Sequence, residues 1–144
     1  GPGPYQSLII EAEVASRGHP GDAAGGAVVL DPDTGHTIAT VGELCGTASN
    51  NVAEYRGMIA GIRAAWDIAP GASLRVLMDS KLVVEQMSGR WKIKHPDMQA
   101  LAREARELIG QGSVSFEWVP REKNARADAA GNAALDRRES FFER

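Results

Sequence analysis

The sequence predicts an α/β fold in which the later strands of a sheet alternate with helices. Short apolar runs typical of strands occur near the N-terminus and again after residue 70. Between them, residues 52–66 repeat apolar side chains at helical spacing. Strands and helices in alternation are the signature of an α/β architecture. The chain has 144 residues, 43% of them apolar, which is enough for one hydrophobic core.

Three strands are predicted in the first third of the chain. They are residues 8–14, 25–30 and 37–41. A loop at residues 16–21 follows the first strand, and a turn at residues 31–35, which contains Asp, Pro and Gly, joins the second to the third. Glu11 and Glu13 have the same parity in the first strand, so their side chains point to the same face.

A helix is predicted to begin near Ser49. Ser49 and Asn50 are both N-cap candidates, because their side chains can accept hydrogen bonds from free backbone amides. The buried face of this helix is formed by Val52, Tyr55, Ile59, Ile62 and Trp66. Glu54 lies in the first turns, off the centre of that face. Taken alone, it is explained by complementing the positive end of the helix dipole.

The second half of the chain adds two strands and two helices. The predicted elements are a strand at residues 74–78, a short helix at 82–87, a strand at 114–119 and a last helix after residue 124. Asp79 follows the first of these strands directly. Asn124 can cap the last helix, which carries Asp128 in its first turns. Ala127, Ala130 and Ala134 lie on one side of that helix.

Four carboxylates therefore lie at the ends of strands or the beginnings of helices. They are Glu13, Glu54, Asp79 and Asp128. Strand ends and the helix starts beside them are where α/β folds gather their sites. Four carboxylates in one place repel each other unless cations lie between them, and oxygen ligands favour hard ions such as Mg²⁺ or Mn²⁺. The sequence thus predicts a site for divalent cations.

These segments together resemble the type 1 ribonuclease H family. The matching segments are residues 11–21, 49–54, 78–83 and 118–128, in the order that the family has them. The resemblance spans roughly residues 8–135. It is greatest to the compact bacterial and archaeal-type branch, which lacks a long basic protrusion.

The resemblance implies a ribonuclease H-like fold and a hydrolytic activity. The fold is a mixed five-stranded sheet, three antiparallel strands followed by two parallel ones, flanked by helices. The implied reaction is hydrolysis of the RNA strand of an RNA–DNA hybrid. Glu13, Glu54, Asp79 and Asp128 would hold two ions, Mg²⁺ or Mn²⁺, at a separation of about 3.5–4 Å, one activating water and one stabilising the leaving 3′ oxygen.

Hybrid recognition requires contact with the 2′-hydroxyl, which lies in a wide, shallow minor groove. Asn50 and Asn51 suit this contact, as do the backbone groups of Ser16, Gly18 and His19, and the neighbouring Arg17 and Ser49 are also predicted to bind the nucleic acid. The side chains of Asn50 and Asn51 offer both donors and acceptors. The alternative for Asn50 is a helix cap, and the two roles are compatible.

A basic segment provides the candidate phosphate contacts. This segment contains several basic side chains and one tryptophan: Lys81, Arg90, Trp91, Lys92, Lys94 and His95. Trp91 would lie against a sugar or base while Lys81, Lys92 and Lys94 meet phosphates. The alternative is a solvated helix end with Trp91 in the core. The net charge of −3 argues against indiscriminate binding of nucleic acid, but not against a local patch.

Two positions depart from the family pattern. Glu13 and Val14 stand where the family has aspartate followed by glycine, and His19 stands where it usually has asparagine. Three functions therefore remain open: an active ribonuclease H, a hybrid-binding module with weakened catalysis, and a nuclease of the same fold acting on another nucleic acid, such as a resolvase or a transposase-like enzyme.

The predicted domain covers residues 5–137. Residues 1–4 are interpreted as a tag remnant, and the charged residues 138–144 as a tail or as a linker to a further domain. The single Cys45 excludes an intrachain disulfide. Because the sequence shows no transmembrane run and no secretory signal, we expect a cytoplasmic protein, and we expect a monomer.

Overall fold

The computed structural model describes residues 5–18 and 21–144. The predicted tag remnant at residues 1–4 and the predicted binding residue His19 therefore lie outside the described residues.

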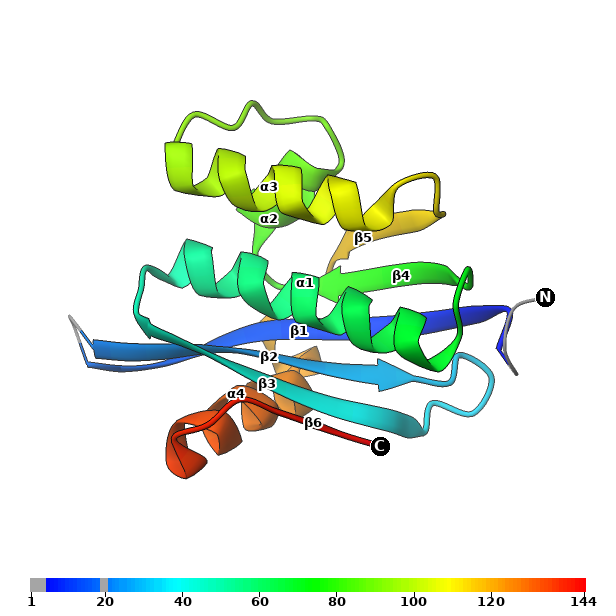
Figure 1. Cartoon of the computed structure of the whole chain (residues 1–144), viewed down its shortest axis with the longest axis horizontal. Coiled ribbons are helices and arrows are strands. Elements are labelled where there is room, and N and C mark those ends of the chain that lie inside the picture. The colour runs from blue at the N-terminus through cyan, green and yellow to red at the C-terminus, as the bar shows by residue number, and fades with distance from the viewer. Residues whose placement is uncertain (1–4, 19–20) are drawn as a thin grey trace.

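A six-stranded mixed sheet runs through the middle of the molecule (Figure 1). The strands are β1 (Ser7–Gly18), β2 (Gly21–Leu30), β3 (Thr37–Thr47), β4 (Ser73–Met78), β5 (Val114–Trp118) and β6 (Phe141–Glu143). Their order across the sheet is β5-β4-β1-β2-β3-β6. β1, β2 and β3 pair antiparallel, whereas β4 pairs parallel with β1 and β5 parallel with β4. The predicted arrangement of three antiparallel and two parallel strands is confirmed.

The sixth strand, β6, corrects the predicted count of five. It pairs antiparallel with β3, with Phe142 opposite Val41. The hydroxyl oxygen of Ser140 accepts a hydrogen bond from the amide of Leu44 at 2.9 Å, which fixes the approach to this strand. Residues 138–144, interpreted from the sequence as a tail or a linker, thus include a short edge strand. Three paired residues are too few to show a period in the sequence.

The hairpin of β1 and β2 is longer than predicted. Ser16 pairs with Ala23 and Arg17 with Asp22, so the ladder continues through most of the predicted loop at residues 16–21. The loop prediction is wrong for residues 16–18, because backbone pairing continues past the last buried side chain of the strand. β3 likewise continues beyond its predicted end at residue 41.

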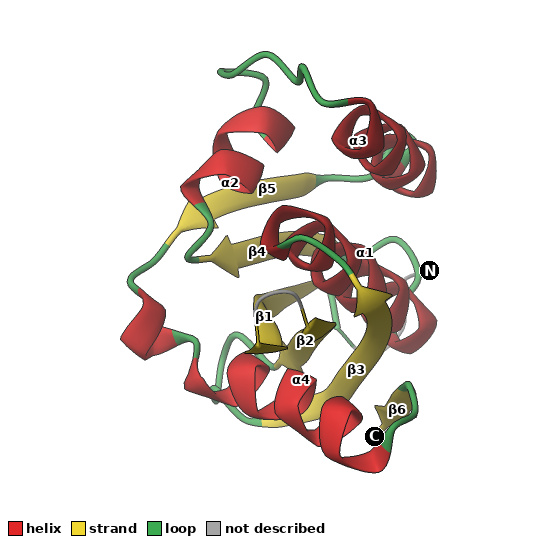
Figure 2. Cartoon of the chain, turned by 90° about the vertical axis from the view of Figure 1, so that its left-hand side faces the viewer, coloured by secondary structure: helices red, strands yellow, loops and turns green. Residues whose placement is uncertain are grey.

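Helices cover both faces of the sheet. They are α1 (Asn50–Ile68), α2 (Lys81–Met87), α3 (Pro96–Ile109) and α4 (Ala125–Arg137), and a 3-10 turn spans Arg121–Lys123. α1 and α4 lie on opposite faces of the sheet, and α3 packs mainly against α1 (Figure 2). Within the described residues, no helix combines the length and the apolar character that crossing a membrane requires.

Two consecutive glycines in β2 let α1 and α4 approach the sheet closely. A Cβ atom on Gly25 would overlap the backbone of Gly57 in α1, and a Cβ atom on Gly26 would overlap the carbonyl of Ala127 in α4. Successive strand residues point to opposite faces, so one glycine serves each helix. Because α1 carries Glu54 in its second turn and α4 carries Asp128 in its first, this packing brings both predicted ligands toward the same strands.

The main core lies between the sheet and α1. Tyr55, Ile59 and Ile62 of the predicted apolar face are fully buried. Val52 and Trp66, predicted to belong to the same face, are only half-buried. A smaller cluster between the sheet and α4 consists of Ala15, Ala24, Ala134 and Leu135.

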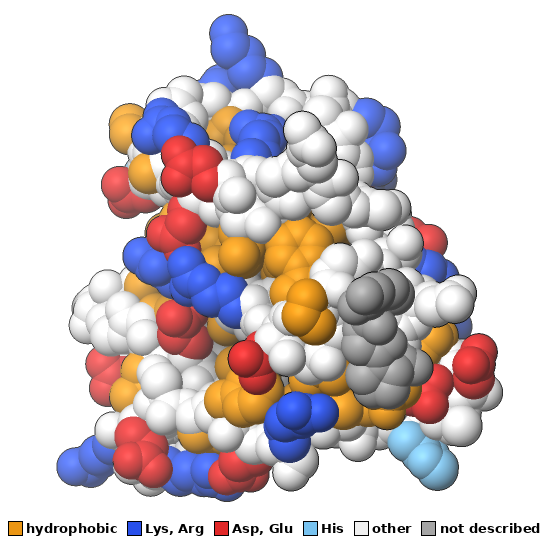
Figure 3. All heavy atoms as spheres, turned by 45° about the vertical axis from the view of Figure 1, so that its right-hand side comes forward, with side chains coloured by type: hydrophobic (Ala, Val, Ile, Leu, Met, Phe, Trp, Pro, Cys, Tyr) orange, Lys and Arg blue, Asp and Glu red, His pale blue; other side chains and the backbone are white. Residues whose placement is uncertain are grey.

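The surface carries charges of both signs. On the face shown in Figure 3, Lys and Arg side chains are interspersed with Asp and Glu, and hydrophobic side chains gather in the middle of the face. A single-sign field therefore does not cover this side of the molecule.

Candidate metal centre and nucleic-acid interface

Three of the four predicted carboxylates meet where the parallel pairing of β1 with β4 stops. The pairing of β1 with β4 ends at Ala12 and Met78, so the next residues along the chain are Glu13, within β1, and Asp79, directly after β4. Glu13 therefore lies in the middle of its strand, whereas the sequence had indicated a position near the strand end. Glu54 reaches the same place from the second turn of α1. Each of these three carboxylates has an oxygen within 4.8 Å of an oxygen of the others.

Asp128 lies in the wall of the same pocket without joining this close group. The pocket has a volume of about 530 Å³, and Glu13, Glu54, Asp79 and Asp128 all line it. Asp128 is half-buried in the first turn of α4. The side-chain nitrogen of Asn132, one turn later, donates to the carbonyl of Asp128 at 3.0 Å and to its carboxylate at 3.4 Å. Asn132 was not predicted, although its spacing of four residues from Asp128 places both on one helix face.

The close carboxylates are buried and incompletely satisfied. Glu13 is 2% exposed and Glu54 is 5% exposed. The amide of Val14 donates to Oε1 of Glu13 at 2.9 Å. Oε2 of Glu13, Oε2 of Glu54 and Oδ1 of Asp79 are buried without a hydrogen-bond partner. Buried oxygens of this kind need a partner, and hard divalent cations take carboxylate oxygens as ligands, so these residues fit a divalent cation.

Burial also changes the protonation of this group. It raises the pKa of Glu13 from 4.5 to about 7, partly opposed by a hydrogen bond with the carboxyl group of Glu54. Burial raises the pKa of Glu54 above its usual range as well, and its contact with Glu13 adds to the rise. Because like charges this close disfavour double ionisation, the pair retains a proton that a bound cation would displace.

The beginning of α1 is capped by Ser49, not by Asn50. The hydroxyl oxygen of Ser49 accepts from the amide of Val52 at 3.2 Å, and Asn50 is the first residue of the helix. The cap alternative for Asn50 is therefore wrong. Its exposed side chain lies beside the carboxylate pocket, which Ser16, Asn50 and Asn51 also line.

A second depression continues from this pocket. It is lined by Ser16, Gly18, Gly21, Thr47, Ala48, Ser49 and Asn50. The structure thus brings together, next to the carboxylates, most of the residues predicted to contact the 2′-hydroxyl. Arg17 is turned away from them, since its guanidinium group forms an ion pair with Asp136 of α4 at 2.7 Å.

The predicted basic segment forms a separate groove with α3. Trp91 and Lys92 line it, together with Arg103 and Arg106 of α3, which the sequence analysis did not identify. The two arginines are three residues apart and so share one helix face. Trp91 is 45% exposed, so the alternative that placed it in the core is wrong.

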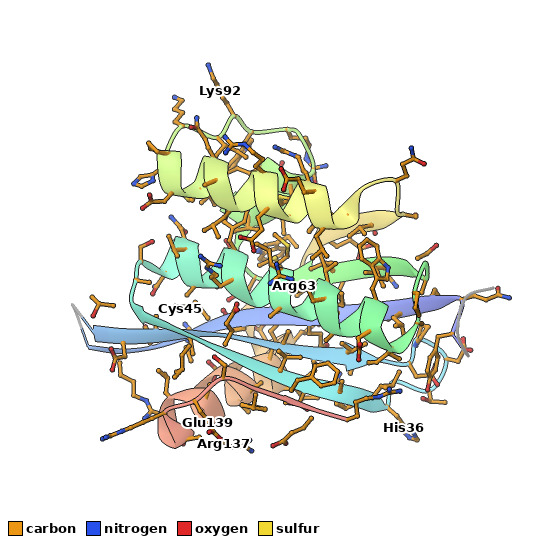
Figure 4. The ribbon with its side chains drawn as sticks, viewed as in Figure 1. His36, Cys45, Arg63, Lys92, Arg137 and Glu139 are labelled. Carbon is orange, nitrogen blue, oxygen red and sulfur yellow. The ribbon has the colours of Figure 1, made fainter. Side chains whose placement is uncertain are left out.

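The other cations of this segment are placed as follows. Lys81 is the exposed first residue of α2, and Lys94 is exposed in the loop before α3. Lys92 projects outward from that loop (Figure 4). Arg90 is held by Glu85 at 2.6 Å, which leaves it less available to phosphate. Figure 4 also shows His36 and Cys45 at opposite ends of the sheet, and Cys45 is half-buried.

Asn124 precedes α4 as predicted, but its side chain makes no cap hydrogen bond. It is fully buried, and its amide nitrogen donates to main-chain carbonyls of β1 and β4. The cap interpretation of Asn124 is therefore wrong.

Comparison with known proteins places this chain in a family. A sequence family described as "Reverse transcriptase-like" matches residues 11–134. The crystal structure of RNase H1 from Halobacterium salinarum is 39% identical in sequence and superposes with a TM-score of 0.83, covering 91% of this chain and 98% of that one. The chain belongs to the type 1 ribonuclease H family. The fold and the family predicted from the sequence are thereby confirmed.

Two further ribonuclease H relatives bear on function. The bifunctional protein Rv2228c of Mycobacterium tuberculosis is 50% identical over 130 residues, which are 90% of this chain and 35% of that protein. The structure of its N-terminal RNase H domain has a TM-score of 0.83 and 49% identity, covering 91% of this chain and 94% of that one. LC11-RNase H1, solved in complex with an RNA/DNA hybrid, has a TM-score of 0.83 and 32% identity, covering 91% and 98% of the two chains. This chain thus spans about a third of the mycobacterial protein, 35% of its length.

Proposed function

We propose that this chain hydrolyses the RNA strand of RNA–DNA hybrids, using two divalent cations, Mg²⁺ or Mn²⁺. The observation that carries the proposal is the meeting of Glu13, Glu54 and Asp79, whose ligand oxygens lie within 4.8 Å of one another, where the pairing of β1 with β4 stops. Membership of the ribonuclease H family and the hybrid bound by LC11-RNase H1 support the choice of substrate.

The residues that would hold the cations are Glu13, Glu54, Asp79 and Asp128. When bound, such cations activate a water molecule and stabilise the oxygen that leaves the phosphodiester. The buried, partner-free oxygens of Glu13, Glu54 and Asp79 supply ligand atoms that a cation would satisfy on displacing the proton of the pair. Asp128 is half-buried and its carboxylate accepts from Asn132, so it would serve as the fourth ligand from the wall of the pocket.

Recognition of the hybrid would use the depression beside these carboxylates. Because Ser49 provides the helix cap, the amide group of Asn50 is free to donate to and accept from a 2′-hydroxyl. Asn51 and the backbone of Ser16 and Gly18 lie alongside. Phosphates farther along the duplex would meet the groove of Trp91 and Lys92, together with Lys81 and Lys94.

One observation favours the second candidate, a hybrid-binding module with weakened catalysis. Glu13 is one methylene longer than the aspartate of the family, and its Oε1 is engaged by the amide of Val14. A carboxylate held in this way is displaced from where an aspartate would hold it. The same shape would then bind hybrid without hydrolysing it efficiently.

A gel assay on the purified chain tests the proposal. The substrates are end-labelled RNA–DNA hybrid, duplex RNA and duplex DNA, each with Mg²⁺ and then with Mn²⁺. Cleavage of the hybrid alone supports the ribonuclease H activity. Tight binding without cleavage selects the binding module, and cleavage of a duplex in preference to the hybrid selects a nuclease acting on another nucleic acid.

A further inference from the structure

Asn124 is a fully buried polar residue that lies outside the carboxylate group. Its side-chain nitrogen donates to the carbonyl of Ala12 at 2.9 Å and to the carbonyl of Leu77 at 3.4 Å. The orientation of the amide group follows from these partners, because carbonyl oxygens accept and only the nitrogen end can donate. The side chain therefore bridges two strands that are far apart in the sequence.

Both acceptor carbonyls belong to the segments that carry carboxylates. Ala12 directly precedes Glu13, and Leu77 lies two residues before Asp79. The parallel pairing of β1 and β4 ends at Ala12, which makes this the point at which the two strands are free to separate. Asn124 continues the cross-strand hydrogen bonding where the strand ladder stops.

A third hydrogen bond joins Asn124 to the remaining segment of the site. The amide of Asp128 donates to the carbonyl of Asn124 at 3.0 Å, in the first turn of α4. Asn124 is thus hydrogen-bonded through its side chain to the segments that carry Glu13 and Asp79, and through its main-chain carbonyl to the amide of Asp128. Of the four carboxylates, only Glu54 on α1 is not tied to it by these bonds.

We propose that Asn124 is a positioning residue for the cation site: it fixes the spacing of Glu13 and Asp79 and the direction in which α4 presents Asp128. Its hydrogen bonds within the described residues go to main-chain atoms and not to the carboxylate side chains. The physical need for this bridge comes from electrostatic repulsion, since three carboxylates with oxygens within 4.8 Å of one another favour separation of the segments of β1 and β4 beside Glu13 and Asp79. Removing the amide takes away its hydrogen bonds to the carbonyls of Ala12 and Leu77 and with them this link between the two segments. This inference rests on the proposed role of the carboxylates as ligands.

The test measures Mn²⁺ affinity without nucleic acid. MnCl₂ is titrated calorimetrically into the unmodified chain, Asn124→Ala and Asn124→Ser. The unmodified chain has the amide that bonds both carbonyls, Asn124→Ala has no side-chain donor, and Asn124→Ser has a hydroxyl that is too short to reach both carbonyls. Groups that orient metal ligands typically change affinity by about 10- to 100-fold when removed, and we expect a loss of that size for Asn124→Ala and a smaller one for Asn124→Ser.

The matched control is Ile68→Ala. Ile68 is buried at the far end of α1, away from the carboxylates, so this variant loses stability without loosening the site. Its Mn²⁺ affinity should equal that of the unmodified chain. In single-turnover cleavage of hybrid, Asn124→Ala should lose rate at low Mn²⁺ and recover part of it at high Mn²⁺, with unchanged affinity for the hybrid.

The outcomes separate this inference from the proposed function. If Asn124→Ala binds Mn²⁺ as tightly as the unmodified chain, Asn124 is a structural residue only and the inference is overturned. Should Asn124→Ala fail to fold, the Mn²⁺ affinity of Asn124→Ser decides in the same way. If the unmodified chain binds Mn²⁺ but cleaves no hybrid, the proposed function fails while the positioning role is still decided by the affinities. No Mn²⁺ binding by the unmodified chain would overturn both.

Discussion

Shortening Glu13 by one methylene is the sharpest test of the cation site. Glu13→Asp restores the side-chain length that the family pattern has at this position. Glu13 is 2% exposed and its Oε1 accepts from the amide of Val14 at 2.9 Å. The substitution withdraws the carboxylate from its present position toward β1 and breaks or lengthens that hydrogen bond.

The size of the effect follows from this displacement. One methylene moves the carboxylate by on the order of 1 Å, and a misplacement of that size changes rates by about 10²-fold. We therefore expect Mg²⁺-supported cleavage to rise by up to about 10²-fold in Glu13→Asp, and Mn²⁺-supported cleavage to rise less, because Mg²⁺ is the stricter ion in its geometry. The branched side chain of Val14, in place of the family's glycine, limits the gain. Loss of one buried methylene should cost about 1 kcal/mol of stability.

The assay is single-turnover cleavage of hybrid with each ion, by the unmodified chain, Glu13→Asp and Glu13→Ala. Glu11→Asp is the matched control, because Glu11 lies on the same strand and face but is ion-paired with Arg126 of α4 at 3.3 Å. It should leave the rates unchanged. Equal rates for the unmodified chain and Glu13→Ala would refute the reasoning, since the first carboxylate would then have no part in catalysis.

Four further expectations follow from the same site. Asp79→Asn should keep the fold but reduce cleavage to background while hybrid binding persists; near-full activity would show that the carboxylate site is misassigned. In the metal-free protein, the pKa of Glu13 is about 7 in the folded state, compared with 4.5 for an unperturbed glutamate. Between these two pH values the folded chain therefore still binds a proton that the unfolded chain has released. The free energy of unfolding should therefore fall across that window, and Mn²⁺ should raise the melting temperature more at pH 8 than at pH 5, both measured by thermal denaturation. Lys92→Ala should weaken binding to every nucleic acid and make the slope of log affinity against log salt shallower by about 0.7–0.9; an unchanged slope places the phosphate contacts elsewhere. Ser49→Ala should cost about 1 kcal/mol through the lost cap, whereas Asn50→Ala should leave stability unchanged and reduce discrimination between hybrid and duplex DNA; equal loss on both substrates would reject the role of Asn50.

The parts of the fold that the sequence predicted are those with a repeating side-chain pattern. The face of α1 that contains Tyr55, Ile59 and Ile62 has a helical period, and β4 is a short apolar run, so both were found at nearly the right residues. β6 and the extension of β1 past Ala15 depend on main-chain pairing with a neighbouring strand. Backbone hydrogen bonds of this kind carry no side-chain period, so the sequence did not show them.

The same distinction applies to the site. Glu13, Glu54 and Asp79 could be proposed together because each lies in a segment that matches the ribonuclease H pattern, in the order that the family has them. Asn124 could not, because its residue type and its place before a helix predict a cap, and its actual partners are 112 and 47 residues away. Arg103 and Arg106 were missed for a related reason: their groove exists only once α3 lies beside the loop that carries Trp91 and Lys92.

The frame of the site and its chemistry rest on different residues. Gly25, Gly26 and Asn124 fix how closely α1, α4 and the strands β1 and β4 approach one another, and none of them carries charge. The fold as a whole superposes on those of its ribonuclease H relatives with a TM-score of 0.83. The position of the first carboxylate within that frame depends instead on the length of one side chain, Glu13. A chain can therefore keep the ribonuclease H fold while the geometry of its cation site changes. Measurements on Glu13 and on Asn124 accordingly test separate claims. Those on Glu13 concern where a ligand atom lies, and those on Asn124 concern what holds in place the strands that carry the ligands.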